Sequence, residues 1–356
     1  MGVPENVPLR SRGPLLRRVA IVLAVIALLA LVVFALSRLE LSRAGHALVT
    51  ASLGWIALAL LLMSLAMLMR AVSWHETLRA ALPDTPMHWW PVVRALMIGV
   101  MASALVPGRI GEPSRVLVLS RRLEGRTTRL LPVVAGTVFS QTLINLLALV
   151  ILLVVSFTSV PLPNGHAAAI ATALALPLAI CALVLAGPRL LALGRRSRWP
   201  RVERAANTVS RLLQLARQGL VVFARPRYGS TAIAFQLLAW ALQWLACYMV
   251  ILALGLESQA GPVAAAAILL AVNLSAILPA TPSNVGVFQA ACLVVLAAYG
   301  VGAGQGLAYG IILQAVEVVT ALALGVPALL KEGLSWQDIR RSGVRAEDEA
   351  EAELES

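Results

Sequence analysis

The sequence has little charge and few of the side chains that catalyse reactions or bind metals. Of its 356 residues, 13% are charged and 5% are aromatic, and there are four histidines and three cysteines. Cys181, Cys247 and Cys292 all lie in apolar stretches, as small buried residues do, and their spacing fits neither a metal site nor a disulfide framework. The sequence contains no phosphate-binding loop, zinc-binding histidine pair or nucleophile elbow. No motif therefore indicates an enzyme, and we expect no metal and no cofactor.

Apolar residues are what the sequence has in excess. They make up 60% of the chain, and the mean hydropathy is +0.86, which is more than a soluble domain of this length can bury. Several apolar runs come near or exceed the ~20 residues that cross a bilayer. They are residues 19–36, 53–73, 131–157, 167–187, 230–254 and 306–330. The first run has no cleavage site after it, so we interpret it as a retained span. We predict an all-α polytopic membrane protein with about six full transmembrane helices.

The charges are unevenly distributed along the chain. Of the 29 basic residues, 28 are arginine, and most of them lie between the apolar runs. Cytoplasmic loops carry the excess of basic residues, so residues 1–18 and the loop 188–228 are placed in the cytoplasm, and the last span, 306–330, then returns the C-terminus to the same side. There the arginines fit membrane orientation and contact with anionic lipid better than nucleic acid. Residues 332–356 carry eight acids and three arginines, and this tail has too little apolar content to fold, so we predict disorder.

Two more apolar segments, residues 92–119 and 262–299, are each broken near the middle. The turn residues are Pro107, Gly108 and Gly111 in the first segment, and Pro279, Pro282 and Gly286 in the second. Neither half of either segment is long enough to cross a bilayer comfortably. A full crossing at 92–119 would also leave six arginines between positions 109 and 129 outside the cell. We therefore predict two re-entrant hairpins.

Each half of the chain is then predicted to contain two spans, a re-entrant hairpin and a third span, in that order. By simple hydropathy the whole chain has about eight hydrophobic segments. Three full crossings per half make the second half enter the membrane from the opposite side. The halves are thus predicted to form an inverted repeat, with one hairpin opening from each face. The repeat is one of topology, because the halves show no convincing residue-level similarity. Paired interruptions of this kind indicate a transport-type binding site.

The turn of the first hairpin concentrates charge within an apolar region. Arg109, Glu112 and Arg115 lie close together there. Two guanidinium groups beside the amides of a helix start suit a phosphate or another anionic headgroup, and Glu112 would orient an arginine or couple to a proton. The alternative is a cluster that only neutralises a buried turn. Arg70, just before Trp74, either faces the same cavity or snorkels to the membrane interface beside an aromatic anchor.

The turn of the second hairpin is polar but neutral. Its candidate binding residues are Thr281, Ser283 and Asn284, with Gln289 on the returning helix. Glu317 is the only acid well inside a full-length span, which makes it a functional candidate that pairs with an arginine. Hydrogen bonds between helices are expected from the neutral residues Gln141, Asn145, Asn273 and Gln314.

The motifs of both hairpins resemble those of one family. The matching patterns are Arg70-x-x-x-Trp74, Pro107-Gly108-Arg109-Ile110-Gly111-Glu112-x-x-Arg115 and Pro279-x-Thr281-Pro282-x-x-x-Gly286-Val287. They are similar to the lysylphosphatidylglycerol synthase transmembrane (flippase-like) family, which includes the flippase domain of the multiple peptide resistance factor. The resemblance covers roughly residues 15–331. It implies an inner-membrane protein linked to translocation of a lipid or a lipid-linked glycan. Lysyl transfer is not expected, because no soluble aminoacyl-transfer domain follows residue 331.

The chain departs from the family at several positions that often carry charge. Neutral residues stand there instead, in the segment Ser140, Gln141 and Asn145 and at Gln289 and Gln314, and Ser283 and Asn284 replace a Gly-Gly pair that is common in the family. Measured against the family, this pattern implies a divergent subgroup with a different headgroup or coupling scheme.

These observations favour a flippase-like translocator formed by residues 19–331, which moves an anionic phospholipid or a lipid-linked glycan. Two alternatives remain open. One is a membrane-embedded transferase or phosphatase that acts on polyprenyl-phosphate lipids, and the other is a non-catalytic partner of a lipid or cell-wall glycan synthase. The expected partners are a membrane phospholipid or polyprenyl-linked lipid, such a synthase, and a second copy of the chain, but no nucleic acid.

Overall fold

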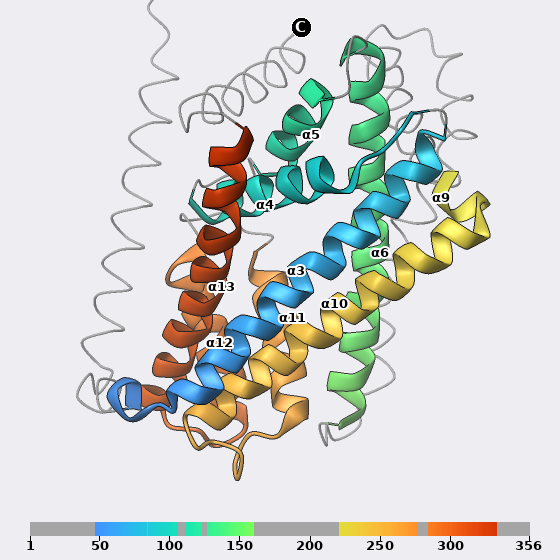
Figure 1. Cartoon of the computed structure of the whole chain (residues 1–356). Coiled ribbons are helices and arrows are strands. Elements are labelled where there is room, and N and C mark those ends of the chain that lie inside the picture. Colours follow the sequence, from blue (N-terminus) through green and yellow to red (C-terminus); the bar gives the residue numbers. More distant parts are fainter. Residues whose placement is uncertain are drawn as a thin grey trace, which may run out of the picture.

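The computed structural model describes residues 47–83, 85–105, 111–122, 127–159, 221–276 and 284–332 (Figure 1). All regular structure in these ranges is helical, which confirms the predicted all-α class for this part of the chain. The helices are α3 (Leu53–Ala81), α4 (Trp89–Leu105), α5 (Gly111–Arg122), α6 (Thr127–Ser159), α9 (Val221–Ala224), α10 (Pro226–Ala253), α11 (Pro262–Ser275), α12 (Val287–Ala298) and α13 (Ala303–Glu332).

Among the described residues, four helices are long and apolar enough to cross a membrane. They are α3, α6, α10 and α13, with 29, 33, 28 and 30 residues. They coincide with the predicted spans 53–73, 131–157, 230–254 and 306–330, so a multi-pass membrane protein is confirmed. The predicted spans 19–36 and 167–187, together with the cytoplasmic segments 1–18 and most of 188–228, lie outside the described residues.

The two broken segments form pairs of short helices. The first pair is α4 and α5, with 17 and 12 residues, and the second is α11 and α12, with 14 and 12 residues. Within each pair the two helices pack against each other. Most turn residues, at 106–110 and 277–283, lie outside the described ranges. Gly286 is described, and its φ of 92° at the start of α12 is a conformation that favours glycine.

The first pair closes at a contact between two glycines. A Cβ atom on Gly111, the first residue of α5, would lie 2.1 Å from the carbonyl oxygen of Gly99 in α4 and 2.0 Å from Oγ of Ser103. No side chain fits in that space, so Gly111 is required by the close approach of α5 to α4.

The two pairs lie toward opposite ends of the helix bundle (Figure 1). Helices α4 and α5 are near the end where α3 and α13 finish and α6 and α10 begin, whereas α11 and α12 are near the other end. The α13 helix continues through Glu332, a residue that the sequence assigned to the acidic tail. The rest of that predicted tail lies outside the described residues.

Helices α3 and α10 run antiparallel and side by side through the bundle (Figure 1). Two hydrogen bonds set their register. The backbone amide of Ser52 donates to the carbonyl of Ala253 over 2.9 Å, and Oγ of Ser73 donates to the carbonyl of Ala232 over 2.8 Å. This register places fully buried small residues opposite one another at seven-residue intervals, in the pairs Ala59 with Ala246, Ala66 with Ala239, and Ser73 with Ala232. Small side chains let two helices approach closely within a membrane.

The helices of the two halves occur in the same order and at the same spacing. Helix α3 begins at Leu53 and α10 at Pro226, while α4 begins at Trp89 and α11 at Pro262, so both pairs are 173 residues apart. The next two pairs, α5 with α12 and α6 with α13, begin 176 residues apart, at Gly111 and Val287 and at Thr127 and Ala303. Packing follows the same correspondence, because α4 packs on α13 as α11 packs on α6, and α5 packs on α6 as α12 packs on α13.

Candidate functional site

A cavity of about 400 Å³ lies between the paired short helices and the four long ones. Residues of α3, α4, α5, α6, α10, α11, α12 and α13 line it, so segments from both halves of the chain enclose it. Its polar side chains are Arg70, Ser103, Glu112, Arg115, Gln141, Asn145, Gln236, Gln243, Asn273, Asn284, Gln314, Glu317 and Thr320. A pocket this polar among apolar helices marks a functional site by default.

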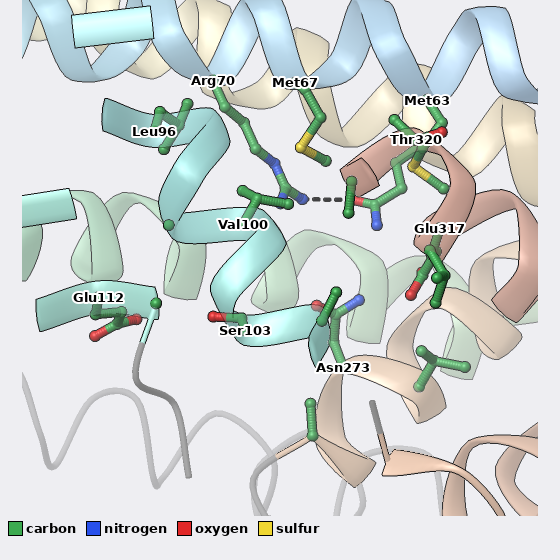
Figure 2. A pocket seen from close by; sticks show the side chains of 18 of the residues that line it. Met63, Met67, Arg70, Leu96, Val100, Ser103, Glu112, Asn273, Glu317 and Thr320 are labelled. Atoms are coloured by element: carbon green, nitrogen blue, oxygen red, sulfur yellow. Dashed lines mark hydrogen bonds between the residues drawn. The ribbon is translucent and has the colours of Figure 1, made fainter. Parts of the chain in front are cut away.

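Arg70 reaches into this cavity from α3 (Figure 2). One terminal nitrogen of its guanidinium donates a hydrogen bond to Oε1 of Gln243 on α10, and its Cζ lies 5.7 Å from the centre of the Trp240 ring. Helix α3 continues beyond Arg70 to Ala81, so Arg70 lies within the helix and not at its end. Trp74 is fully buried and donates from Nε1 to Oγ1 of Thr137 over 3.1 Å, which means that it is not an aromatic anchor at the membrane surface.

Arg115 enters the same cavity from α5. Its Nη1 donates to Oε1 of Gln141 over 2.8 Å, and its Cζ lies 5.2 Å from the centre of the Trp74 ring. Gln141 in turn donates from Nε2 to the backbone carbonyl of Arg70 over 3.4 Å. Each arginine therefore has one amide oxygen and one indole ring as neighbours. A guanidinium has five N–H donors, so both retain donors for a bound anion.

The two carboxylates of the cavity occupy different surroundings. Glu112, in the first turn of α5, is exposed, and Figure 2 shows it at the opposite side of the pocket from Glu317. Glu317 lines the cavity from α13 and makes no ion pair among the described residues. It attracts Arg70 electrostatically, as Glu112 attracts Arg115. The charges in the described part of the cavity, two cations and two anions, therefore balance.

Two of the polar candidates of the second hairpin, Asn284 and Gln289, lie among the described residues. Asn284 lines the cavity. Gln289, which the sequence placed in the binding site, instead joins helices. Its Oε1 accepts from the amide of Gly286 over 2.7 Å, and its Nε2 donates to Gln314 on α13. Thr281 and Ser283, like Arg109 of the first hairpin, lie outside the described residues.

The neutral polar residues mostly join helices, as predicted. Oδ1 of Asn145 on α6 accepts from Nε2 of Gln236 over 2.6 Å and from Nε1 of Trp240 over 3.1 Å, both on α10. Asn273 differs, because its Nδ2 donates to the carbonyl of Leu269 in its own helix over 2.8 Å. The sequence analysis missed Gln236 and Gln243. Their seven-residue spacing within an apolar span puts them on one helix face, which was a usable signal.

In the part of the chain that the structure describes, no group of three His, Cys, Asp or Glu side chains comes together. The cavity offers guanidinium groups, amides and carboxylates inside an apolar helical protein. Groups of these types form strong hydrogen bonds with charged, hydrogen-bonding ligands.

Comparison with known proteins agrees with the motifs of the sequence. A family model described as the lysylphosphatidylglycerol synthase TM region matches residues 19–325, which is most of the chain. A search of curated proteins found no match. The matched range contains every helix described here except the last residues of α13, and it includes both short-helix pairs and the cavity between them. The chain therefore belongs to the lysylphosphatidylglycerol synthase transmembrane-region family, whose membrane proteins are linked to phospholipid modification or translocation.

Proposed function

We propose that this protein translocates a membrane lipid with an anionic headgroup, either a phospholipid or a lipid-linked glycan. The observation that carries the proposal is the central cavity, where Arg70 and Arg115 from different helices face one space inside an apolar protein. The headgroup binds in this cavity, and the acyl or isoprenoid tails stay in the surrounding bilayer. Charged groups within a membrane protein are costly and mark the path of a polar substrate.

The arrangement of the helices supports an inverted repeat. In this proposal α4–α5 and α11–α12 are re-entrant hairpins that open from opposite faces, and six full transmembrane helices surround them. Their positions toward opposite ends of the bundle (Figure 1) and the constant 173- and 176-residue spacing support this topology. Transporters built from inverted repeats bind their substrates where the repeats meet, near the middle of the bilayer.

The orientation and the partners follow from the same proposal. Both termini and the basic loop 188–228 lie in the cytoplasm, and the protein resides in the inner (plasma) membrane. The first hairpin then opens toward the cytoplasm, and its residues Arg109, Glu112 and Arg115 meet the headgroup first. The partners are the transported phospholipid or polyprenyl-linked lipid, a synthase that makes or uses this lipid, and a second copy of the chain.

Lipid movement in liposomes tests the proposal. The full chain is reconstituted with fluorescent phosphatidylglycerol, and transfer between leaflets is followed by quenching at the outer surface. We expect the wild type to accelerate transfer, and we expect Arg70→Gln with Arg115→Gln to reduce it at least tenfold, because each lost ion–anion hydrogen bond costs about 1.5 kcal/mol or more. Arg121→Gln is the matched control, because Arg121 is exposed on the same helix as Arg115 and does not line the cavity.

Two results would contradict the proposal. If lipid transfer is no faster than in protein-free liposomes, the protein does not translocate this lipid. If the wild type and the double variant transfer lipid at equal rates, the cavity is not where the headgroup binds. Chemical conversion of a polyprenyl-phosphate lipid by the purified protein would favour the transferase or phosphatase alternative. Native mass spectrometry of lipid that co-purifies with the chain identifies the headgroup.

A further inference from the structure

The lining of the cavity consists largely of pairs of corresponding positions from the two halves. Position n in α3 or α4 corresponds to n + 173 in α10 or α11, and position n in α5 or α6 corresponds to n + 176 in α12 or α13. The pairs in which both members line the cavity are Met63 with Gln236, Arg70 with Gln243, Gly99 with Val272, Val100 with Asn273, Ser103 with Ala276, Glu112 with Phe288, Gln141 with Glu317, and Asn145 with Ala321. Such pairing arises when a cavity lies on the axis that relates two repeats.

The α3–α10 contact locates this axis. Ala66 and Ala239 are corresponding positions, and the antiparallel register also places them opposite each other. Two residues that are both equivalent and opposed lie on either side of a two-fold axis. Because both alanines are fully buried, the axis passes through a close helix contact.

Arg70 and Gln243 lie one helical turn beyond these alanines, on their own helices. Side chains of an α-helix lean toward its N-terminus, so both residues lean back toward the axis. Their hydrogen bond shows that they meet there. The pair is thus a contact between equivalent positions, in which one member is a cation and the other a neutral amide.

A second pair of corresponding positions in the cavity also combines one charged side chain with one neutral amide, but here the charged side chain is an anion. Glu317 on α13 corresponds to Gln141 on α6, and both line the cavity. The first half therefore supplies the cation of one pair, and the second half supplies the anion of the other. In both pairs the uncharged member is a glutamine, which matches glutamate in length but is shorter than arginine and has two N–H donors and one carbonyl acceptor where arginine has five N–H donors.

We propose that the anionic group of the lipid headgroup binds on this two-fold axis, and that positions 70 and 243 are interchangeable for holding it. This inference rests on the translocation function proposed above and adds where in the cavity the anion sits. A guanidinium extended from either position reaches the same point, because the axis relates the two positions. An anion on the axis is also equally distant from both hairpins. It therefore keeps its contact with the guanidinium whichever hairpin opens.

The experiment moves the charge across the axis. Purified full-chain variants are titrated with dihexanoyl phosphatidylglycerol, a soluble anionic phospholipid. Dihexanoyl phosphatidylcholine, whose headgroup is zwitterionic, serves as the comparison probe. We expect Arg70→Gln to weaken binding of the anionic lipid at least tenfold. Arg70→Gln with Gln243→Arg should restore it to within about fivefold of the wild type. The restoration is incomplete because Trp240 lies beside Arg70, whereas the corresponding neighbour of position 243 is Met67.

A matched control places the same charge elsewhere in the cavity. Arg70→Gln with Asn273→Arg restores the net charge from another lining position, and we expect it to leave binding as weak as in Arg70→Gln alone. Size-exclusion profiles and thermal unfolding establish that each variant folds. If the exchanged variant does not fold, Arg70→Gln with Gln243→Lys makes the same test with a smaller side chain.

The outcomes separate this inference from the function on which it rests. If Arg70→Gln binds and transports like the wild type, the cavity role in the proposed function fails. If Arg70→Gln is weak and a folded exchange variant is equally weak, only the axial site is overturned. Equal rescue by Asn273→Arg and Gln243→Arg also overturns it, because any positive charge in the cavity would then suffice.

Discussion

The two short-helix pairs have the same place in their halves of the chain but differ in what holds them. Arg94 of α4 and Arg122 of α5 form ion pairs with Glu332 at the end of α13, with N–O distances of 2.9 and 2.6 Å. The positions that correspond to these arginines in α11 and α12 are Ala267 and Ala298. There, Gln289 forms the polar contact with α13.

This difference indicates that packing position, not side-chain chemistry, is what the two halves share. Both pairs have a returning helix of 12 residues that packs on a long helix of its own half. One pair is fixed by charge and by a glycine contact, and the other by apolar packing and neutral hydrogen bonds. Among the described residues, α4 and α5 therefore carry charged side chains at one end of the bundle, whereas α11 and α12 carry none at the other.

The largest effect is expected where α5 meets α4. Replacing Gly111 by alanine puts a methyl group 2.1 Å from a backbone carbonyl oxygen, so the helices must separate. We expect the free energy of unfolding to fall by about 3 kcal/mol, measured by thermal unfolding in detergent. Gly306→Ala is the matched control in the second half, because its methyl group would meet Leu293 at an ordinary 3.6 Å. Similar stability of both variants would contradict the close glycine contact.

A smaller effect is expected from the ion pairs of the first hairpin. The Glu332 side chain is 3% exposed, whereas the side chains of Arg94 and Arg122 are 26% and 49% exposed, so solvent screens the pairs in part. We expect Glu332→Gln to lower the free energy of unfolding by about 1–2 kcal/mol, and high salt to lower that of the wild type but not of the variant. Glu76→Gln, which removes an i,i+3 pair with the exposed Arg79, should cost less than about 1 kcal/mol.

The smallest effect is expected at the polar contact of the second hairpin. Gln289→Leu removes a hydrogen bond to Gln314 and another to the amide of Gly286. We expect a loss of about 1 kcal/mol in thermal unfolding, with lipid transfer close to that of the wild type, because Gln289 does not line the cavity. A tenfold loss of lipid transfer at unchanged stability would instead support the prediction from the sequence that Gln289 is a binding residue.

Much of the fold follows from hydropathy and charge alone. The four described spans and both interrupted segments appear in the sequence as runs of apolar residues of different length. Charge inside these runs is rare, so Arg70, Arg115 and Glu317 are visible as candidates without a structure, and all three line the cavity.

What the sequence does not show is the rotation of each helix about its axis. Gln243 and Gln289 are both glutamines in apolar helices, yet one bonds Arg70 in the cavity and the other bonds a neighbouring helix. Trp74 is a further example, because a tryptophan near the end of an apolar run is an interfacial anchor or a buried residue depending on what packs over it.

The correspondence between the two halves cannot be recognised from the residue types either. Equivalent positions keep their spacing and packing, but mostly not their residue types.

The small residues between α3 and α10 have a consequence for how this chain can vary in length. Ala66 fixes the helix contact and Arg70 projects into the cavity one turn later. Inserting one residue between them would rotate Arg70 by about 100° around α3, away from the cavity, while leaving hydropathy and helix propensity unchanged. Natural relatives should therefore tolerate insertions and deletions in the connections between helices, but none within this single turn or within the turn from Ala239 to Gln243.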